Sequence, residues 1–383
     1  MPCACGYWGS PDRSVARCVF SRHQPCLVCD KGREPKLGPR CRRRHGRIAA
    51  PPVPMSVVHQ PLNEGGYMAA GNASSYHELI SAHRRRIGRP VGRAEHIPDV
   101  AGRLAYNPCL VRQRDRTYLA LRVESPQSYW RDETSWDPQV RFFERAGAGW
   151  VPAREAPVFP AAEDPFAAWM LDKNGEPLLV FGVVSLVFQL GTPALVTRFY
   201  AAPDLLQLDP ASPFLEVPGM KDVRLLQCAE GVAVCGRPQG GSAGRGRISF
   251  TFVDSCTDLT PGAVKDSHVF HDQVAEDTKI GANELYDLGD RIGVLGHVAI
   301  GDEGGPQSYA AAWWTIDPVR LTASRPEVVA VRDDFPAAPA KWPNLADVVF
   351  PGSLEPLDGG MARLYCGLGD ASVGSVVLRS PLP

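Results

Sequence analysis

The sequence predicts an all-β fold, a five-bladed β-propeller, preceded by a disordered N-terminal arm and one short helix. Short polar motifs recur at intervals of 57, 58, 61 and 64 residues, and a repeat of this length is typical of stacked or radial supersecondary units. Short β-type runs separated by turn residues fill each interval. The 37 glycines and 36 prolines suit many turns and few long helices.

The five motifs place polar residues beside β-type stretches. They are Asn107-Pro108, Asp164-Pro165, Lys221-Asp222-Val223-Arg224, Asn283-Glu284 and Asp347-Val348-Val349-Phe350. Corresponding residues of propeller blades converge on one central axis, so the motifs predict where a site lies. We expect Asn107-Pro108 to be a blade-entry turn. Pro165 is expected to hold Asp164 in extended geometry.

Apolar runs predict two strands in each unit. They are Thr117–Val123 and Val140–Phe143, Leu178–Val184 and Leu195–Tyr200, Val232–Cys235 and Ile248–Val253, Arg291–Ile300 and Ala310–Ile316, and Ala362–Gly367 and Val373–Leu378. A unit of about 60 residues is long enough for a four-stranded blade with one long loop.

Two regions are predicted. Residues 1–70 form a disordered basic arm rich in Cys, Arg and Pro, which also fits sequence ahead of a later start site. Residues 71–383 form the propeller domain with a short N-terminal helix. In that helix Ser75 is the expected cap, Glu78 completes a capping box, and Leu79, Ile80 and Ile87 supply an apolar stripe.

Charge and cysteine usage differ between the two regions. Residues 1–50 hold 11 of the 41 basic and 3 of the 42 acidic residues, so the remainder carries a net charge of −9. An acidic body argues against a nucleic-acid partner, and no apolar run is long enough for a membrane span. Five single cysteines in the body indicate reduced, buried thiols in a cytoplasmic protein. A monomer and a homo-oligomer are both compatible with the sequence.

The arm contains one zinc-like pattern, CxxC followed by CxxxH. Its residues are Cys26, Cys29, Cys41 and His45, which matches the residue types and spacing of structural zinc sites. The alternative, which we favour, is a disordered tail or sequence upstream of a start at Met55 or Met68. No residue of the body requires a metal.

Three carboxylates are the catalytic candidates, Asp164, Glu284 and Asp347. Each belongs to a repeated motif, and a pair of carboxylates is what general acid and base catalysis on a glycosidic bond requires. The structural alternative is an Asx-turn at the strand entrance.

Further charged and polar residues lie within or at the ends of apolar strands, where they need partners. The predicted substrate- or phosphate-binding residues are Arg122, Glu124, Lys221, Asp222, Arg224, Arg237, Asn283, His297 and Lys341. A cluster of basic residues and carboxylates suits a phosphate or a polyhydroxylated ligand. The alternative is a set of inter-blade salt bridges. Three aromatic residues lie in a polar loop, Tyr129, Trp130 and Trp136. They either stack on a sugar at the rim of the site or pack against the protein.

Seven segments of the chain resemble a known family. They are YNPCLV (106–111), LRVE (121–124), EDPF (163–166), MKDVRLL (220–226), GRPQG (236–240), GANELYDLGDRIGVLGHVA (281–299) and DVVFPGSLEPLDGGMARLYCGLGDASVG (347–374). They resemble domain of unknown function 1861, which is similar in architecture to the five-bladed glycosidases of glycoside hydrolase family 130. The resemblance covers about residues 95–380.

The resemblance implies carbohydrate chemistry at the propeller axis, since family 130 enzymes are largely inverting phosphorylases of β-mannosides, with some hydrolases. It places the single catalytic acid on Asp164. It makes Arg122, Lys221, Arg224, Arg237 and His297 contacts for phosphate or sugar. Phe166 departs from the family pattern, which commonly has Arg there, and this puts phosphate binding at that position in doubt.

The expected function is a glycoside phosphorylase or hydrolase. Asp164 would protonate the leaving oxygen while inorganic phosphate, or a water activated by Glu284 or Asp347, attacks the opposite face. Phosphate as a co-substrate is the one small-molecule partner besides the carbohydrate, and no cofactor is expected. The alternative is a non-catalytic sugar-binding or interaction propeller, which Phe166 favours.

Overall fold

The computed structural model describes residues 73–382, apart from 87, 190–191, 241–245 and 303. These residues belong to one compact unit. The predicted arm, its zinc-like pattern and Ile87 lie outside the described residues.

Antiparallel strands dominate the described chain, and three sheets follow one another along it. The first holds β2 (Leu104–Gln113), β3 (Arg116–Glu124), β4 (Gln139–Ala146), β5 (Gly149–Pro152) and β6 (Phe159–Pro160). The second holds β7 (Ala162–Leu171), β8 (Pro177–Gln189), β9 (Thr192–Ala202) and β10 (Leu215–Pro218). The third holds β11 (Met220–Cys228), β12 (Gly231–Pro238), β13 (Ser249–Val253) and β14 (His268–Val269).

The fourth sheet has nine strands and consists of two antiparallel parts. One part is β15 (Lys279–Asp287), β16 (Ile292–Ile300) and β17 (Ser308–Asp317), with the short β18 (Thr322–Ala323) and β19 (Glu327–Ala330). The other is β20 (Asp347–Leu357), β21 (Met361–Leu368), β22 (Ser372–Arg379) and β1 (Gly92–Glu95). Only two parallel pairs join β17 to β20. Strand pairing therefore gives four sheets where the sequence predicted five separate ones.

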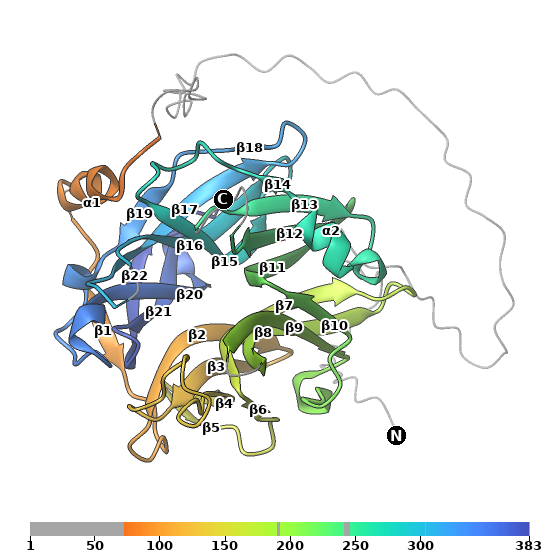
Figure 1. The fold of residues 1–383 in the computed structure, drawn as a ribbon, viewed down its shortest axis with the longest axis horizontal. Helices are drawn as coiled ribbons and strands as arrows, with labels where there is room; N and C mark the ends of the chain where they lie inside the picture. The colour runs from red at the N-terminus through yellow and green to blue at the C-terminus, as the bar shows by residue number, and fades with distance from the viewer. Residues whose placement is uncertain (1–72, 87, 190–191, 241–245, 303, 383) are drawn as a thin grey trace, which may run out of the picture. The chain divides into compact units, whose positions relative to one another are not determined.

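The first long strand of each part lies towards the middle of the domain. In Figure 1 the sheets follow chain order around a common centre. The inner strands contact one another in a closed series, in which β2 contacts β7, β7 contacts β11, β11 contacts β15, β15 contacts β20 and β20 contacts β2. Side chains on these five strands are therefore the ones that meet at the centre.

The predicted strands are confirmed. Eight lie within a slightly longer strand of the structure, and the other two, Ile248–Val253 and Arg291–Ile300, start one residue before β13 and β16. The five inner strands β2, β7, β11, β15 and β20 were not among the predicted strands, and they contain the polar motifs. Asn107-Pro108 lies inside β2 and not at a blade-entry turn, because a β-bulge accommodates the proline within the strand.

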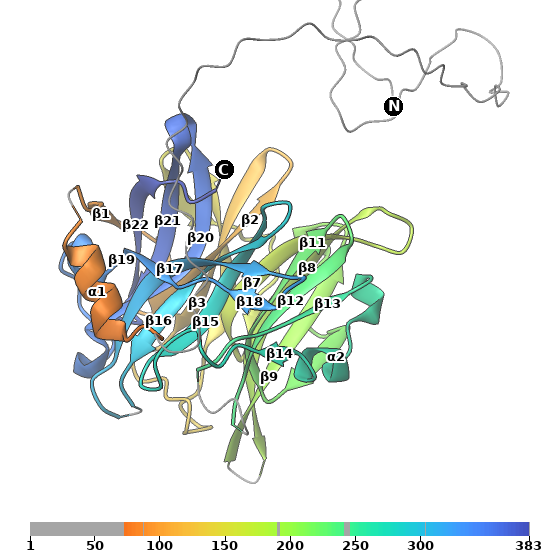
Figure 2. The ribbon, with the colours of Figure 1, turned by 90° about the horizontal axis from the view of Figure 1, so that it is seen from above.

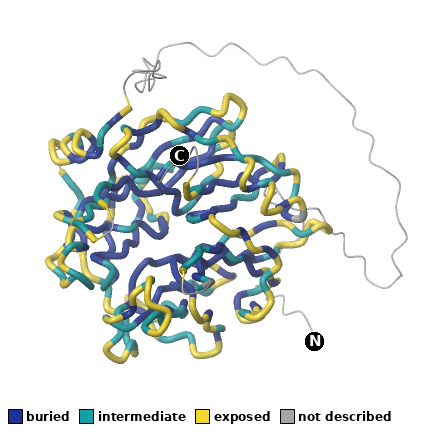
Figure 3. Tube along the Cα trace, in the orientation of Figure 1, coloured by how far each residue is buried: buried dark blue, intermediate teal, exposed yellow. Residues whose placement is uncertain are grey.

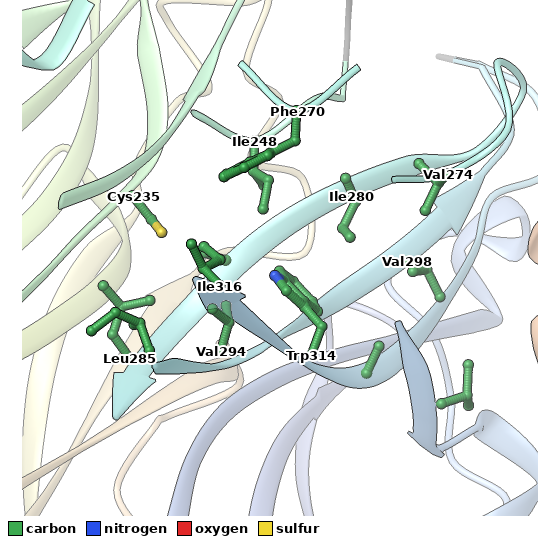
Figure 4. Packing of buried hydrophobic residues seen from close by; sticks show 14 of the residues in the cluster. Cys235, Ile248, Phe270, Val274, Ile280, Leu285, Val294, Val298, Trp314 and Ile316 are labelled. Carbon is green, nitrogen blue, oxygen red and sulfur yellow. The ribbon is translucent and has the colours of Figure 1, made fainter. Parts of the chain in front are cut away.

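Hydrophobic clusters between neighbouring sheets hold the domain together. Figure 3 shows buried chain in the inner strands and exposed chain mainly at the periphery. Figure 4 shows the cluster between β12–β13 and β15–β17, where Cys235 and Ile248 face Ile280 and Trp314. Trp314 is 1% exposed. Burial of apolar surface on this scale is the main favourable term in folding.

The predicted helix is α1 (Tyr76–Arg84), and its capping box between Ser75 and Glu78 is present. Leu79 and Ile80 are buried, and Figure 2 shows the helix at the edge of the domain beside β19. A second helix, α2 (Pro261–Lys265), was not predicted, because five residues are too few to produce a helical pattern.

Single-turn 3₁₀ helices occupy several connections. They are η1 (Leu205–Gln207), η3 (Cys256–Asp258), η4 (Arg332–Asp334), η5 (Pro343–Leu345) and η6 (Asp358–Gly360). The five body cysteines are free and buried, as predicted. None of the helices in the described chain is both long and apolar enough to cross a membrane.

Candidate functional site

A β-bulge interrupts each of the five inner strands near its beginning. The register shifts lie between Tyr106 and Cys109, Glu163 and Phe166, Lys221 and Arg224, Ala282 and Glu284, and Pro351 and Ser353. Four of these bulges coincide with the predicted motifs. The fifth is a correction, because the bulge lies at Gly352, five residues after Asp347. Glycine has no side chain, so a search for polar residues misses it.

Three bulge residues adopt left-handed backbone geometry. The φ angles are 49° at Asn107, 50° at Asp164 and 51° at Asp222. Asn and Asp are the non-glycine residues that tolerate this region best. The extended geometry predicted for Asp164 is therefore wrong. The bulge, and not the following proline, sets the direction of its side chain.

Asp164 is a buried carboxylate surrounded by donors. Asn107 Nδ2 donates to its Oδ1 at 2.7 Å, and Lys221 Nζ lies 3.4 Å from its Oδ2. Burial alone would raise the pKa of Asp164, but the charges of Lys221 and Arg122 outweigh it and lower the pKa to about 2. In the free protein Asp164 is therefore ionised at neutral pH.

A second group of charges connects Asp164 to the first sheet. Arg122 pairs with Glu163 at 2.5 Å and with Glu124 at 2.8 Å, and its guanidinium lies 5.1 Å from the Tyr106 ring and 5.2 Å from the Trp136 ring. Glu163 also lies 3.3 Å from Lys221. Predicted binding residues thus form inter-sheet ion pairs, so the two interpretations of these residues describe one network.

Lys341 extends the network to the segment that precedes β20. Its Nζ pairs with Glu124, which also accepts a hydrogen bond from the Tyr106 hydroxyl. Burial opposes ionisation of Glu124, but Arg122 and Lys341 lower its pKa below the usual value. Glu124 is consequently a carboxylate that two cations hold in its charged form.

A third group lies on β11, β12, β15 and β16. Arg237 Nε is 2.8 Å from Asp222 Oδ2, and Arg237 Nη1 donates to His297 Nε2 at 3.2 Å. Since guanidinium cannot accept, His297 carries its proton on Nδ1, which donates to Asn283 Oδ1 at 2.8 Å. Burial lowers the His297 pKa to about 3, so the ring is neutral.

Arg224 and Gly281 complete this third group. Arg224 is almost fully buried, donates to the Asn283 carbonyl at 2.8 Å and lies 5.4 Å from the Phe166 ring. Phe166 thus contributes to packing beneath an arginine. A Cβ atom on Gly281 would lie 2.6 Å from Asp222 Oδ2 and 2.7 Å from His297 Nε2. Glycine is therefore required for these two side chains to approach.

Two of the three predicted catalytic carboxylates lie outside this network. Glu284 accepts hydrogen bonds from the Tyr286 hydroxyl and from the Leu354 amide, and burial raises its pKa. Asp347 is exposed at the first position of β20, where it pairs with Ser308 of β17. Both are thus separate from the ion pairs that hold Asp164, Asp222 and Glu124. The charge of Arg112 acts on Glu284 but does not outweigh its burial.

Asp370 is a site carboxylate that the sequence motifs did not predict. It lies in the turn between β21 and β22 with φ 52°. Burial raises its pKa to about 6, and the charges that act on it include those of Arg122, Asp164, Glu124 and Lys341. Glu163 was also missed, although it adjoins Asp164. The sequence feature that could have indicated Asp370 is the closing GLGD segment. This segment is not one of the five regularly spaced motifs.

No group of three or more His, Cys, Asp or Glu side chains within the described chain is arranged to hold a metal ion. The site residues instead form alternating cations and carboxylates. Such an arrangement can bind hydroxyl groups or an oxyanion and can exchange a proton at a carboxylate.

The family of the chain is established by its sequence. Residues 95–383 match the family described as Protein of unknown function (DUF1861), and the chain belongs to it. No curated protein sequence matches the chain.

Solved structures share this fold. A mannose phosphorylase from Leishmania mexicana, solved in complex with phosphate ion, is 23% identical with a TM-score of 0.68, over 80% of this chain and 93% of that one. A GDP-Man-dependent mannosyltransferase from Leishmania mexicana is 22% identical with a TM-score of 0.69, over 80% and 94%. A β-1,2-mannobiose phosphorylase from Listeria innocua is 13% identical with a TM-score of 0.52, over 74% and 92%.

Proposed function

We propose that the protein is a carbohydrate-active enzyme on a five-bladed β-propeller, a glycoside phosphorylase or hydrolase acting on a small mannoside or oligosaccharide. The closed series of five inner strands, each with one bulge, supports the count of five blades. The activities named for the similar structures support a mannose-containing substrate.

The observation that carries the proposal is the setting of Asp164. Its carboxylate lies on a bulge among the inner strands, with Asn107 and Lys221 in direct contact and Arg122 nearby. A general acid must sit where its proton reaches the leaving oxygen, and the surrounding donors are suited to orient sugar hydroxyls or phosphate.

Asp164 needs a proton before it acts as an acid, and phosphate offers a way to supply it. A phosphate bound by Lys221 and Arg237 would engage cations now paired with Asp164 and Asp222, and would add negative charge beside Asp164. Both effects raise the pKa of Asp164. Phosphate binding and protonation of Asp164 would therefore favour each other.

The water route needs a second carboxylate, and Asp370 fits this role better than Glu284 or Asp347. Asp370 shares the charge environment of Asp164, and its pKa of about 6 leaves it ionised at neutral pH. An ionised carboxylate with a pKa near the working pH is suited to activating water. The route thus depends on which nucleophile occupies the site.

A non-catalytic sugar-binding propeller is the second candidate. The low pKa of Asp164 favours it, because an acid that stays ionised contributes only hydrogen-bond acceptance. Phe166, which packs under Arg224, also removes the arginine expected at that position in family 130.

The test is incubation of the protein with β-1,2-mannobiose and aryl β-mannosides, with and without inorganic phosphate, and analysis of the products. We expect sugar 1-phosphate to form only when phosphate is present. Free sugar in both conditions would identify a hydrolase. Saturable sugar binding without turnover would support the non-catalytic candidate, and absence of both binding and turnover would overturn the proposal.

A further inference from the structure

The geometry points to a second sugar-binding element, formed by Tyr129, Trp130 and Trp342, which we name the aromatic rim. We infer that it holds a pyranose ring of an oligosaccharide beyond the ring that is cleaved. The inference rests on the proposed function for its substrate class, since it extends the same site to a longer ligand.

The aromatic rim joins two loops that are far apart in the sequence. Tyr129 and Trp130 belong to the connection between β3 and β4, and Trp342 precedes η5. The ring centroids of Tyr129 and Trp342 are 5.7 Å apart at 75°, and those of Tyr129 and Trp130 are 6.4 Å apart at 60°. The three rings thus form one continuous cluster.

The aromatic rim directly adjoins the charged network. Lys341 Nζ lies 4.6 Å from the Trp342 ring centroid and pairs with Glu124. In the same β3–β4 connection, Trp136 packs against the guanidinium of Arg122. A ligand that contacts Arg122 or Lys341 would therefore have its next ring within reach of the rim.

Hydrogen bonds within the protein order both loops. The Asp132 carboxylate accepts hydrogen bonds from the Thr134 amide and hydroxyl. The backbone amide of Asp132 donates to the Tyr129 carbonyl. The Lys341 amide donates to the Gly369 carbonyl at 2.8 Å. An aromatic surface ordered in advance loses little conformational entropy when it binds a ligand.

Exposure distinguishes the aromatic rim from core aromatics. Tyr129 is 39% exposed, and Trp130 and Trp342 are partly exposed, whereas Trp314 and Trp150 are buried in the domain core. A pyranose presents a face of C–H groups that packs on an aromatic ring while its hydroxyls stay in water. Arg131 lies 4.7 Å from the Trp130 ring centroid and Lys341 lies 4.6 Å from that of Trp342, so a sugar would pack on the opposite faces of these two rings.

The test compares the binding of mannose, β-1,2-mannobiose and a β-1,2-linked mannotriose by calorimetry. We expect Trp342→Ala and Tyr129→Ala to weaken the trisaccharide about tenfold and to leave mannose within twofold, since only the longer sugar reaches the aromatic rings. Tyr129→Phe should retain the trisaccharide affinity. Phe214→Ala, which removes a 46% exposed aromatic elsewhere, is the matched control.

The outcomes separate this inference from the proposed function. Equal losses for mannose and trisaccharide, or no loss, would overturn the aromatic rim, as would a wild type that binds the longer sugar no more tightly than mannose. If the wild type favours the trisaccharide and the rim variants lose that preference, the rim stands even where no turnover occurs. Thermal unfolding of each variant shows whether it is folded.

Discussion

Asp164 and Glu284 are two carboxylates beside the same backbone feature with opposite electrostatic settings. Each lies at a bulge of an inner strand, β7 or β15. Lys221 and Arg122 lower the pKa of Asp164, whereas burial raises the pKa of Glu284, whose hydrogen-bond donors are the neutral Tyr286 hydroxyl and Leu354 amide. The bulge therefore directs a side chain, and the neighbouring charges decide what chemistry it can perform.

The largest expected effect is on Asp164. Asp164→Asn keeps the shape and the contact with Lys221 but cannot donate an acidic proton, so turnover of the mannoside should fall at least about 10³-fold. Initial rates measured at equal protein concentration provide the check. Asp209→Asn, at an exposed turn, controls for the loss of one carboxylate. Retained activity in Asp164→Asn would remove this residue from the mechanism.

Lys221 should have the next largest effect. Lys221→Met removes a cation that lies near both Glu163 and Asp164, so turnover should fall about 10- to 100-fold. The folded-state pKa of Asp164 is below its unfolded value, so its stabilising contribution is present above that value and is lost as the pH falls towards 2.

Removing Lys221 raises the Asp164 pKa towards the unfolded value. The free energy of unfolding of both proteins should fall between pH 5 and pH 2.5. The fall should be about 1–2 kcal/mol smaller in the variant than in the wild type. Urea unfolding at several pH values measures this difference. An identical pH dependence in both proteins would mean that Lys221 does not control Asp164.

The smallest effect is expected at Glu284. Glu284→Gln keeps an acceptor for the Leu354 amide, so activity should stay within about threefold of the wild type. Burial raises the folded-state pKa of Glu284, so the ionised form opposes folding as the pH rises through that pKa. The variant should be as stable as the wild type, or slightly more stable, at pH 8. A large loss of activity would restore Glu284 as a catalytic candidate.

Much of the fold could be predicted because strands leave strong local signals. Runs such as Thr117–Val123 and Val373–Leu378 are rich in β-branched and apolar residues, and each lies within a strand of the structure. The parallel pairing of Ser308 with Asp347 could not be predicted, since no local pattern specifies which two distant strands meet. The pairing of His83 with Asp334 was hidden for the same reason.

Prediction of the candidate site depended on whether a residue lies in the repeated motifs. Asp164 and Asp222 occupy corresponding positions in successive units. Lys221, the neighbour of Asp222, lies within 3.4 Å of Asp164. Asp347 was selected because it is a polar residue at about the expected interval. The bulge of that strand lies at Gly352 instead. Asp370 comes from a turn between strands, so its approach to the network depends on how the last sheet packs.

The pairing of β1 with β22 has a consequence for how the domain forms on the ribosome. Gly92 pairs with Val376. The strand β1 is synthesised early, and it can pair only after β22, the last strand of the domain, has been synthesised. Until β22 emerges, the hydrogen-bonding edge of β1 is open to other chains. Contacts between such distant residues are typical of slowly folding β proteins, and partly made chains of this kind are prone to aggregate.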